Sequence, residues 1–144
     1  MKQAEVRCYF DADILGLGKL ISGLRPDCTY PGDPGAVIHK RQRPPCTISA
    51  TATPDTEWIP RVTAEGLLII TRDAKIQRRV AEVQAIVEHG ATMVALTSKD
   101  ATTLWNQLEV FMTQWRNVEQ LHGLPGPIIY RASRTALTKL DLNA

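Results

Sequence analysis

The chain has 144 residues, of which 44% are hydrophobic and 22% charged, and its formal net charge is +2. These values are typical of one globular domain over residues 1–144, and so small a net charge does not by itself indicate binding to nucleic acid. The longest aliphatic run, Leu67 to Ile70, is too short to cross a bilayer, and residues 6–10 are too short for the apolar part of a signal peptide. Three cysteines without close pairing predict free thiols, so we expect a cytoplasmic protein that does not contact membranes.

The first third of the chain predicts a strand, a helix and a long loop. Residues 6–10 form an apolar run typical of a buried strand, and residues 14–24 have the apolar spacing of a helix. Residues 28–30 are expected to form a short second strand. Residues 31–52 contain turn formers without an apolar period, which predicts a long loop, and the basic run of residues 39–43 lies within it between prolines.

The rest of the chain predicts alternating helices and strands. Thr53 followed by Pro54 indicates a helix start, Pro60 indicates either a kink or a later start, and Gly66 suits the position after the last turn. The aliphatic run of residues 67–71 predicts a strand buried on both faces. The same reasoning predicts a helix over 75–89, a strand over 92–96, a helix from about 102 to 121 and a strand over 127–130. This alternation predicts an α/β domain with helices on both faces of a mainly parallel sheet.

The predicted helix over 102–121 has a wide apolar face. Trp58, Trp105 and Trp115 are all expected to lie mainly on apolar helix faces, where core packing explains them. Extra apolar width indicates a surface for a partner, either a second copy of the chain or the helix of another protein. The expected stripe consists of Leu104, Leu108, Phe111, Trp115 and Val118, and it is widened by Trp105 and Met112.

Four aspartates fall where predicted strands end or a predicted helix begins. Asp11 and Asp13 follow the first strand, Asp73 follows the strand over 67–71, and Asp55 opens the helix before that strand. Ligands of open α/β sheets bind beyond the carboxyl ends of the strands, so these carboxylates are candidates for one cluster. Such a cluster needs protons or a cation, and carboxylate oxygens suit Mg²⁺ or Mn²⁺, which can activate water to hydrolyse a phosphodiester. Each aspartate taken alone could equally form a turn or cap a helix.

Three short motifs occur in order along the chain: Phe10-Asp11-Ala12-Asp13, then Asp55, Trp58, Ile59, Ala64 and Gly66, and finally Thr71-Arg72-Asp73. Together they resemble a PIN-like domain over roughly residues 6–100. The resemblance implies a three-layer α/β/α fold with a central, mainly parallel sheet, and a metal-dependent ribonuclease that takes RNA as its substrate. It further implies the toxin of a type II toxin–antitoxin pair, similar to the VapC type, with an antitoxin protein as partner.

One position of the family pattern is missing, because no glutamate lies between Glu5 and Glu57. Asp13 and Glu57 are the candidates to replace it, although Glu57 can also be explained as a charge in the first turn of a helix. The pattern is closer to a divergent PIN-like branch that has a doublet of acids, or of acid and amide, after the first strand. The missing glutamate leaves open a second possibility, a PIN-like module that binds RNA or protein without cleaving it.

Two other kinds of site match the sequence less well. A haloacid dehalogenase-type phosphatase would use Asp11 as nucleophile and Asp13 as general acid, but it has no use for Asp55 and the short chain leaves little room for a cap. A zinc site would need Cys28, His39 and Cys46, whose spacing differs from the short paired spacings of zinc sites.

Basic residues in two places are candidates for contact with RNA. Lys40, Arg41 and Arg43 in the predicted loop could hold phosphates, since guanidinium groups bind phosphate oxygens in pairs, or could simply be solvated. Arg72 and Lys75 lie beside Asp73 in the sequence and are candidates to touch the scissile phosphate, with pairing to a carboxylate as the alternative.

Overall fold

The computed structural model describes residues 1–72, 80–97 and 99–141. Within these residues the main sheet has the strand order β3-β2-β6-β7-β8-β9. All neighbouring strands are parallel except β8 and β9. The predicted α/β/α architecture with a mainly parallel sheet is therefore confirmed. The strands are β2 (Cys8–Phe10), β3 (Cys28–Thr29), β6 (Leu68–Arg72), β7 (Thr92–Leu96), β8 (Ile128–Ala132) and β9 (Leu137–Lys139).

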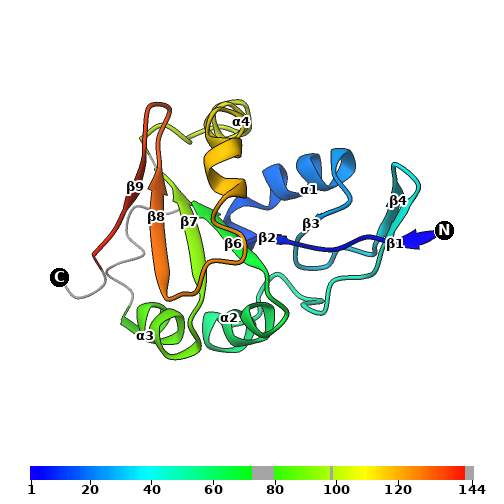
Figure 1. Ribbon diagram of the computed structural model, residues 1–144, viewed down its shortest axis with the longest axis horizontal. Coiled ribbons are helices and arrows are strands. Elements are labelled where there is room, and N and C mark those ends of the chain that lie inside the picture. Colours follow the sequence, from blue (N-terminus) through cyan, green and yellow to red (C-terminus); the bar gives the residue numbers. More distant parts are fainter. Residues whose placement is uncertain (73–79, 98, 142–144) are drawn as a thin grey trace.

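Helices cover both faces of the main sheet, and the sheet divides the core in two. Side chains alternate along the strands, so Phe10 and Ile70 contribute to the core beneath α1 and α4 while Tyr9 and Ile69 contribute to the core beneath α2 and α3. The two helix layers lie above and below the strands in Figure 1. The helices are α1 (Leu15–Leu24), preceded by the 3₁₀ turn η1 (Ala12–Ile14), then α2 (Asp55–Ala64), α3 (Val80–His89) and α4 (Leu104–Glu119).

The prediction of a long loop over residues 31–52 is wrong in part, because these residues contain a β-hairpin. Strands β4 (Ala36–Ile38) and β5 (Arg41–Arg43) pair in antiparallel fashion, and β1 (Lys2–Gln3) pairs in parallel with β5 to form a small second sheet. His39 and Lys40 form the turn with φ angles of 51° and 62°. Two-residue hairpin turns with positive φ favour Asn-Gly, so the sequence lacks the usual signal for this hairpin.

A buried ion pair joins the small sheet to the rest of the domain. Nε of Arg43 donates to Oδ2 of Asp33 at 2.7 Å, and the two residues are only 2% and 3% exposed. Nη1 of Arg43 donates to the carbonyl oxygens of Ser22 and Arg25, at the end of α1, and Asp33 also accepts from the Thr29 hydroxyl at 2.8 Å. The prediction that Arg43 contacts RNA is therefore wrong, because its guanidinium is buried and occupied by protein acceptors.

Helix α4 buries the predicted stripe in part, because Phe111 and Val118 are buried and Leu108 and Trp115 pack against the core. Trp105 is 76% exposed and Leu104 47% exposed, so the expectation that they pack in the core is wrong, whereas Trp58 is buried as predicted. The side-chain amides of Gln107 and Gln114 instead donate to carbonyl oxygens of the loops after β7 and β8. The buried face of α4 comprises Gln107, Val110, Phe111, Gln114 and Val118.

Two further sequence expectations concern the cysteine thiols and the crossing of a membrane. Cys8 and Cys28 are buried free thiols and Cys46 is partly buried, as expected for thiols in or near a core. None of the helices in the described ranges has the length and apolar character that crossing a bilayer requires.

Candidate active site

Asp11 lies directly after β2, at the carboxyl edge of the main sheet. Its backbone amide donates to the carbonyl of Ile70 at 2.9 Å, which continues the pairing between β2 and β6. Its side chain caps η1 by accepting a hydrogen bond from the Ala12 amide at 2.6 Å. The strand and the turn together therefore fix the position of this carboxylate.

Asp13 is held beside Asp11 by the end of β6. Oγ1 of Thr71 lies 2.8 Å from Oδ2 of Asp13 and 3.4 Å from Oδ2 of Asp11. Because a hydroxyl has one proton, the short hydrogen bond to Asp13 is the stronger of the two. The backbone amide of Arg72 also donates to the Asp13 carboxylate at 3.3 Å. The carboxylates of Asp11 and Asp13, which follow β2, are thus joined through Thr71 near the end of the neighbouring strand β6. We call Asp11 and Asp13 the acidic pair.

Asp55 is the first residue of α2 and acts on the acidic pair through its charge. Oδ1 of Asp55 accepts a hydrogen bond from the Trp58 indole at 2.8 Å. Burial is the largest cause of the raised pKa of Asp11 and of Tyr9, and the charge of Asp55 adds to the increase in both. Glu57 is exposed and lies two positions further along the helix, which turns it away from the side occupied by Asp55. Of the two candidates to replace the family glutamate, Asp13 rather than Glu57 therefore lies beside Asp11.

Burial and neighbouring charge make Asp11 an unusual carboxyl group. Burial raises its pKa to about 7, and repulsion from Asp13 and Asp55 contributes to the increase, while the hydrogen bonds from Ala12 and Thr71 oppose it. Near neutral pH this carboxyl group is therefore close to the midpoint of its titration. Such a group at the edge of an α/β sheet is a typical sign of a functional site.

Tyr9, which has no sequence signal of a site residue, lies close enough to Asp11 to be affected by its charge. Its ring is buried and stacks on Trp58 with the ring centroids 5.1 Å apart. Burial, followed by the charges of Asp11 and other neighbours, raises the pKa of its hydroxyl, so the phenol stays protonated. In the sequence Tyr9 looks like one more apolar strand residue, and only the alternation of faces along β2 would place it on the side of Asp11.

The acidic pair offers hard oxygen donors of the kind that Mg²⁺ or Mn²⁺ prefers. The repulsion that raises the pKa of Asp11 is what a divalent cation would relieve. Among residues 1–72, 80–97 and 99–141, no group of three or more histidine, cysteine, aspartate or glutamate side chains is suited to hold a metal ion. Two expected site residues, Asp73 and Lys75, lie outside the described residues. The described donors therefore fit part of a magnesium or manganese site.

Two polar groups at the same edge have no hydrogen-bond partner in the described part of the chain. Nε of Arg72 and Oγ1 of Thr97 are both buried and unpaired. Arg72 is paired in register with Leu96, so Thr97 follows at the same edge of the sheet, one strand away. Unpaired buried polar atoms are costly, so both positions are candidates for contact with a ligand or water, as is Oγ1 of Thr63, which is unpaired among the described residues at the other edge of the sheet.

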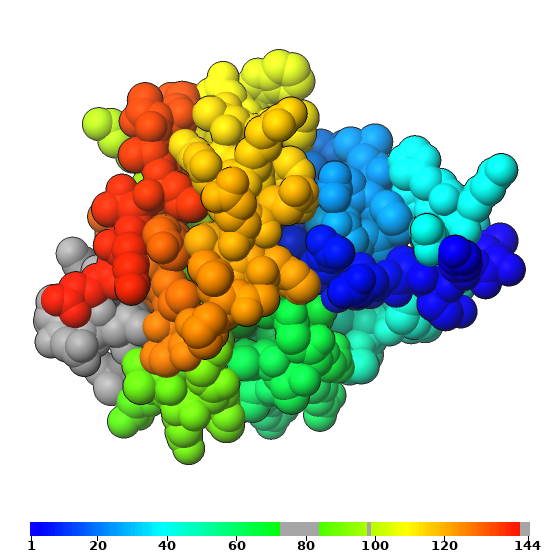
Figure 2. Space-filling view, in the orientation of Figure 1, coloured from blue at the N-terminus to red at the C-terminus, as the bar shows by residue number. Residues whose placement is uncertain are grey.

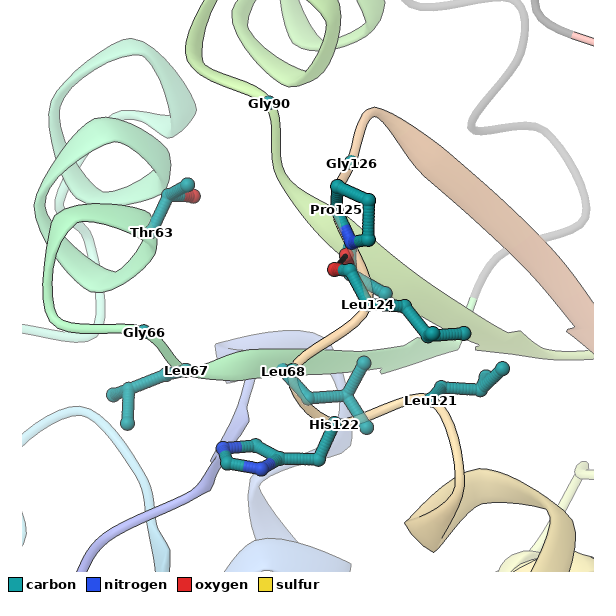
Figure 3. A pocket seen from close by; sticks show the side chains of 12 residues that line it. Thr63, Gly66, Leu67, Leu68, Gly90, Leu121, His122, Leu124, Pro125 and Gly126 are labelled. Atoms are coloured by element: carbon teal, nitrogen blue, oxygen red, sulfur yellow. Dashed lines mark hydrogen bonds between the residues drawn. The ribbon is translucent and has the colours of Figure 1, made fainter.

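The opposite edge of the main sheet has a pocket of 190 Å³ without acidic residues. Figure 3 shows it between the starts of β6 and β7 and the segment before β8, with His122 and Thr63 pointing in from different sides. Among the described residues no carboxylate lines it, and the strands that border it begin there rather than end. The site that the sequence predicts is therefore the acidic pair and not this pocket.

The predicted basic residues are divided among different places. Arg72 lies at the acidic pair, whereas Lys40 and Arg41 are exposed on the hairpin of the small sheet.

A family model described as a PIN like domain matches residues 9–98, more than half of the chain. No curated protein and no solved structure matches the chain. The matched segment contains the acidic pair, Asp55 and the end of β6, and it favours this family over a haloacid dehalogenase-type phosphatase. The chain belongs to the PIN-like domain family.

Proposed function

We propose that this protein is a metal-dependent ribonuclease that hydrolyses phosphodiester bonds of RNA with Mg²⁺ or Mn²⁺. The observation that supports this most directly is the acidic pair, two carboxylates joined through Thr71 at the carboxyl edge of a parallel sheet. The family adds a nuclease-type fold to this arrangement. Asp55 and Asp73 complete the proposed set of acids, and Arg72 and Lys75 are proposed to contact the substrate phosphate.

The chemistry proposed for the site divides between a metal and the protein. A bound divalent ion would lower the pKa of a coordinated water and stabilise charge on a phosphate oxygen. Asp11 and Asp13 would hold that ion, and Asp11 would lose its proton as the ion binds, because the ion offsets the repulsion from Asp13 and Asp55. Thr71 and the Arg72 amide would keep the Asp13 carboxylate oriented toward Asp11.

Cleavage of labelled RNA by the purified protein tests this proposal. Activity is expected with Mg²⁺ or Mn²⁺, is expected to vanish in excess EDTA, and should return when metal is restored. Asp11→Asn should abolish it, while Asp141→Asn is the matched control because Leu140, just before it, pairs with Ile129 near the opposite edge of the sheet. Thr71→Val removes a hydroxyl that orients the proposed metal ligands but is not itself a ligand. Activity or metal affinity should therefore fall roughly 10–100-fold.

Three results would contradict the proposal. Equal cleavage in excess chelator would exclude a role for the metal, and full activity of Asp11→Asn would exclude the acidic pair. RNA binding without any cleavage, under all metal conditions, would favour the inactive PIN-like module instead.

The finer part of the proposal is that the enzyme is the toxin of a type II toxin–antitoxin pair, acting in the cytoplasm. It is supported by apolar side chains on α1 and α4 that a partner protein, an antitoxin or a second copy, could cover. Leu24 is 58% exposed, Trp105 76% and Met112 64%. Induced expression should arrest growth of a bacterial host, and Asp11→Asn should relieve the arrest. Equal arrest by both proteins would separate toxicity from the proposed chemistry.

A further inference from the structure

We propose that RNA also binds in a basic groove beside the β4–β5 hairpin, away from the acidic pair; this inference rests on the proposed function. The groove has a volume of 610 Å³ and lies between residues 3–7, the end of α1 and the hairpin turn. We call it the hairpin groove. Its lining includes the basic side chains of Arg7, Arg25, His39 and Arg41.

Positive charge at the hairpin groove exceeds the charge of the nearby acids. The two carboxylates that line it already have arginine partners: Glu5 lies 3.6 Å from Arg7, and Asp27 binds Arg25 through two hydrogen bonds of 2.9 Å. Arg41 forms no ion pair with any residue in the described ranges, and its direct neighbour across the β1–β5 pairing is another cation, Lys2. Like charges directly opposite each other destabilise a sheet, so this arrangement favours a bound anion.

The hairpin turn adds two basic side chains in a strained backbone conformation. His39 and Lys40 have φ angles of 51° and 62°, in the left-handed region that residues with side chains seldom adopt. Asn-Gly would form the same turn with less strain, yet here both positions have exposed basic side chains. Strain that is retained at such positions indicates that the side chains themselves are used.

The hairpin groove lies at the edge of the main sheet opposite the acidic pair. Arg7 immediately precedes β2 and Asp11 follows it, so the two are separated by about 13 Å along the strand at ~3.3 Å per residue. Figure 2 shows the N-terminal residues and the hairpin together at one end of the molecule, away from β9. A small phosphodiester bound at the acidic pair therefore cannot reach the hairpin groove, whereas an RNA strand can extend to both.

The distribution of the cations favours RNA over an acidic protein segment. His39 of the turn and Arg41 of β5 line the groove, while Lys2 of β1 lies opposite Arg41 and Lys40 follows His39 in the turn, so positive charge is spread over several segments rather than focused on one point. Repeated phosphates match such a distribution, and contacts to phosphate position a strand without reading its bases. The hairpin groove would therefore increase affinity for long RNA and leave the choice of cleaved bond to the region around the acidic pair.

A charge-neutral variant of the hairpin tests the inference. Binding of a labelled oligouridylate of about 12 nucleotides is measured in EDTA at several salt concentrations. Loss of three phosphate contacts should reduce the slope of log affinity against log salt by about 2, and should weaken binding on the order of 10²-fold at about 0.1 M salt. Asparagine replaces the lysine in the turn because it tolerates the left-handed conformation. The variant is Lys2→Gln/Lys40→Asn/Arg41→Gln, and its control, which removes as many exposed charges elsewhere, is Lys19→Gln/Arg116→Gln/Lys139→Gln.

The outcomes separate this inference from the proposed function. Unchanged affinity and slope in the hairpin variant, or an equal loss in the control, would overturn the inference. So would an equal loss of binding to polyglutamate, which would identify a site for acidic protein. Hydrolysis of bis(p-nitrophenyl) phosphate, which is too small to span both places, should be unaffected in the hairpin variant. If this hydrolysis is absent in every form while the hairpin variant alone loses RNA binding, the hairpin groove stands and the proposed activity fails.

Discussion

Replacing Arg43 by alanine should destabilise the domain far more than replacing its exposed neighbour Arg41. The change leaves Asp33 buried without its cation and removes the hydrogen bonds to Ser22 and Arg25. Removing one partner of a buried ion pair costs about 3–5 kcal/mol, a large part of the stability of a domain. Arg41→Ala should change the free energy of unfolding by no more than about 0.5 kcal/mol, because Arg41 is exposed.

Urea denaturation followed by tryptophan fluorescence measures this difference, since Trp58 is buried and should report unfolding. The midpoint should fall for Arg43→Ala with an unchanged m-value. Arg43→Lys should recover only part of the loss, because an ammonium group cannot bind Asp33 and the end of α1 in the same geometry. The reasoning fails if Arg43→Ala and Arg41→Ala differ by less than about 1 kcal/mol, since Asp33 would then have to be solvated or neutral in the folded state.

Three other substitutions have predicted signs. The pKa of Asp11 is raised to about 7, so its carboxyl group stabilises the metal-free fold below about pH 4 and loses this contribution as the pH rises through 7. The stability of Asp11→Asn relative to the parent should therefore increase by up to ~4 kcal/mol between about pH 4 and pH 8, and a constant difference in chelator would contradict the assigned pKa. On α1, Gly23→Ala should stabilise by about 0.5–1 kcal/mol because, apart from its chain neighbours and the nearby helix backbone, no heavy atom of the described residues lies within 4 Å of the added Cβ. Gly18→Ala should destabilise, since the added Cβ would lie 2.8 Å from Cβ of Phe10, and thermal unfolding that showed the same sign for both would refute this packing argument.

The strands of the main sheet were predictable where they are buried on both faces. Residues 92–96 show this best, because the predicted strand has the same bounds as β7. Strands β1 and β9 were missed for the opposite reason. Both are short and largely exposed, and each owes its conformation to a partner strand distant in sequence or to a turn rather than to an apolar pattern of its own.

The candidate site was predictable in its acids but not in the groups that hold them. Asp11 and Asp13 follow a recognisable strand. Because ligands of open α/β sheets bind beyond the carboxyl ends of the strands, the sequence places these two residues at that edge of the sheet. Thr71 matched the family motif, yet a threonine at the end of an aliphatic strand does not reveal which carboxylates its hydroxyl will meet. Arg43 shows the same limit, since its partner Asp33 lies among prolines and glycines where an aspartate usually signals a turn.

The short outermost strands restrict how copies of this protein can associate. The main sheet ends in β3 and β9, of two and three residues, and Lys139 occupies the outer strand β9. Both edges are brief and β9 is also charged, so they offer little backbone for the addition of a foreign strand, and concentrated protein should resist edge-to-edge aggregation. Any stable assembly that it forms would then be built from side chains on its helices, and exposed Trp105 offers a fluorescent reporter of such an assembly.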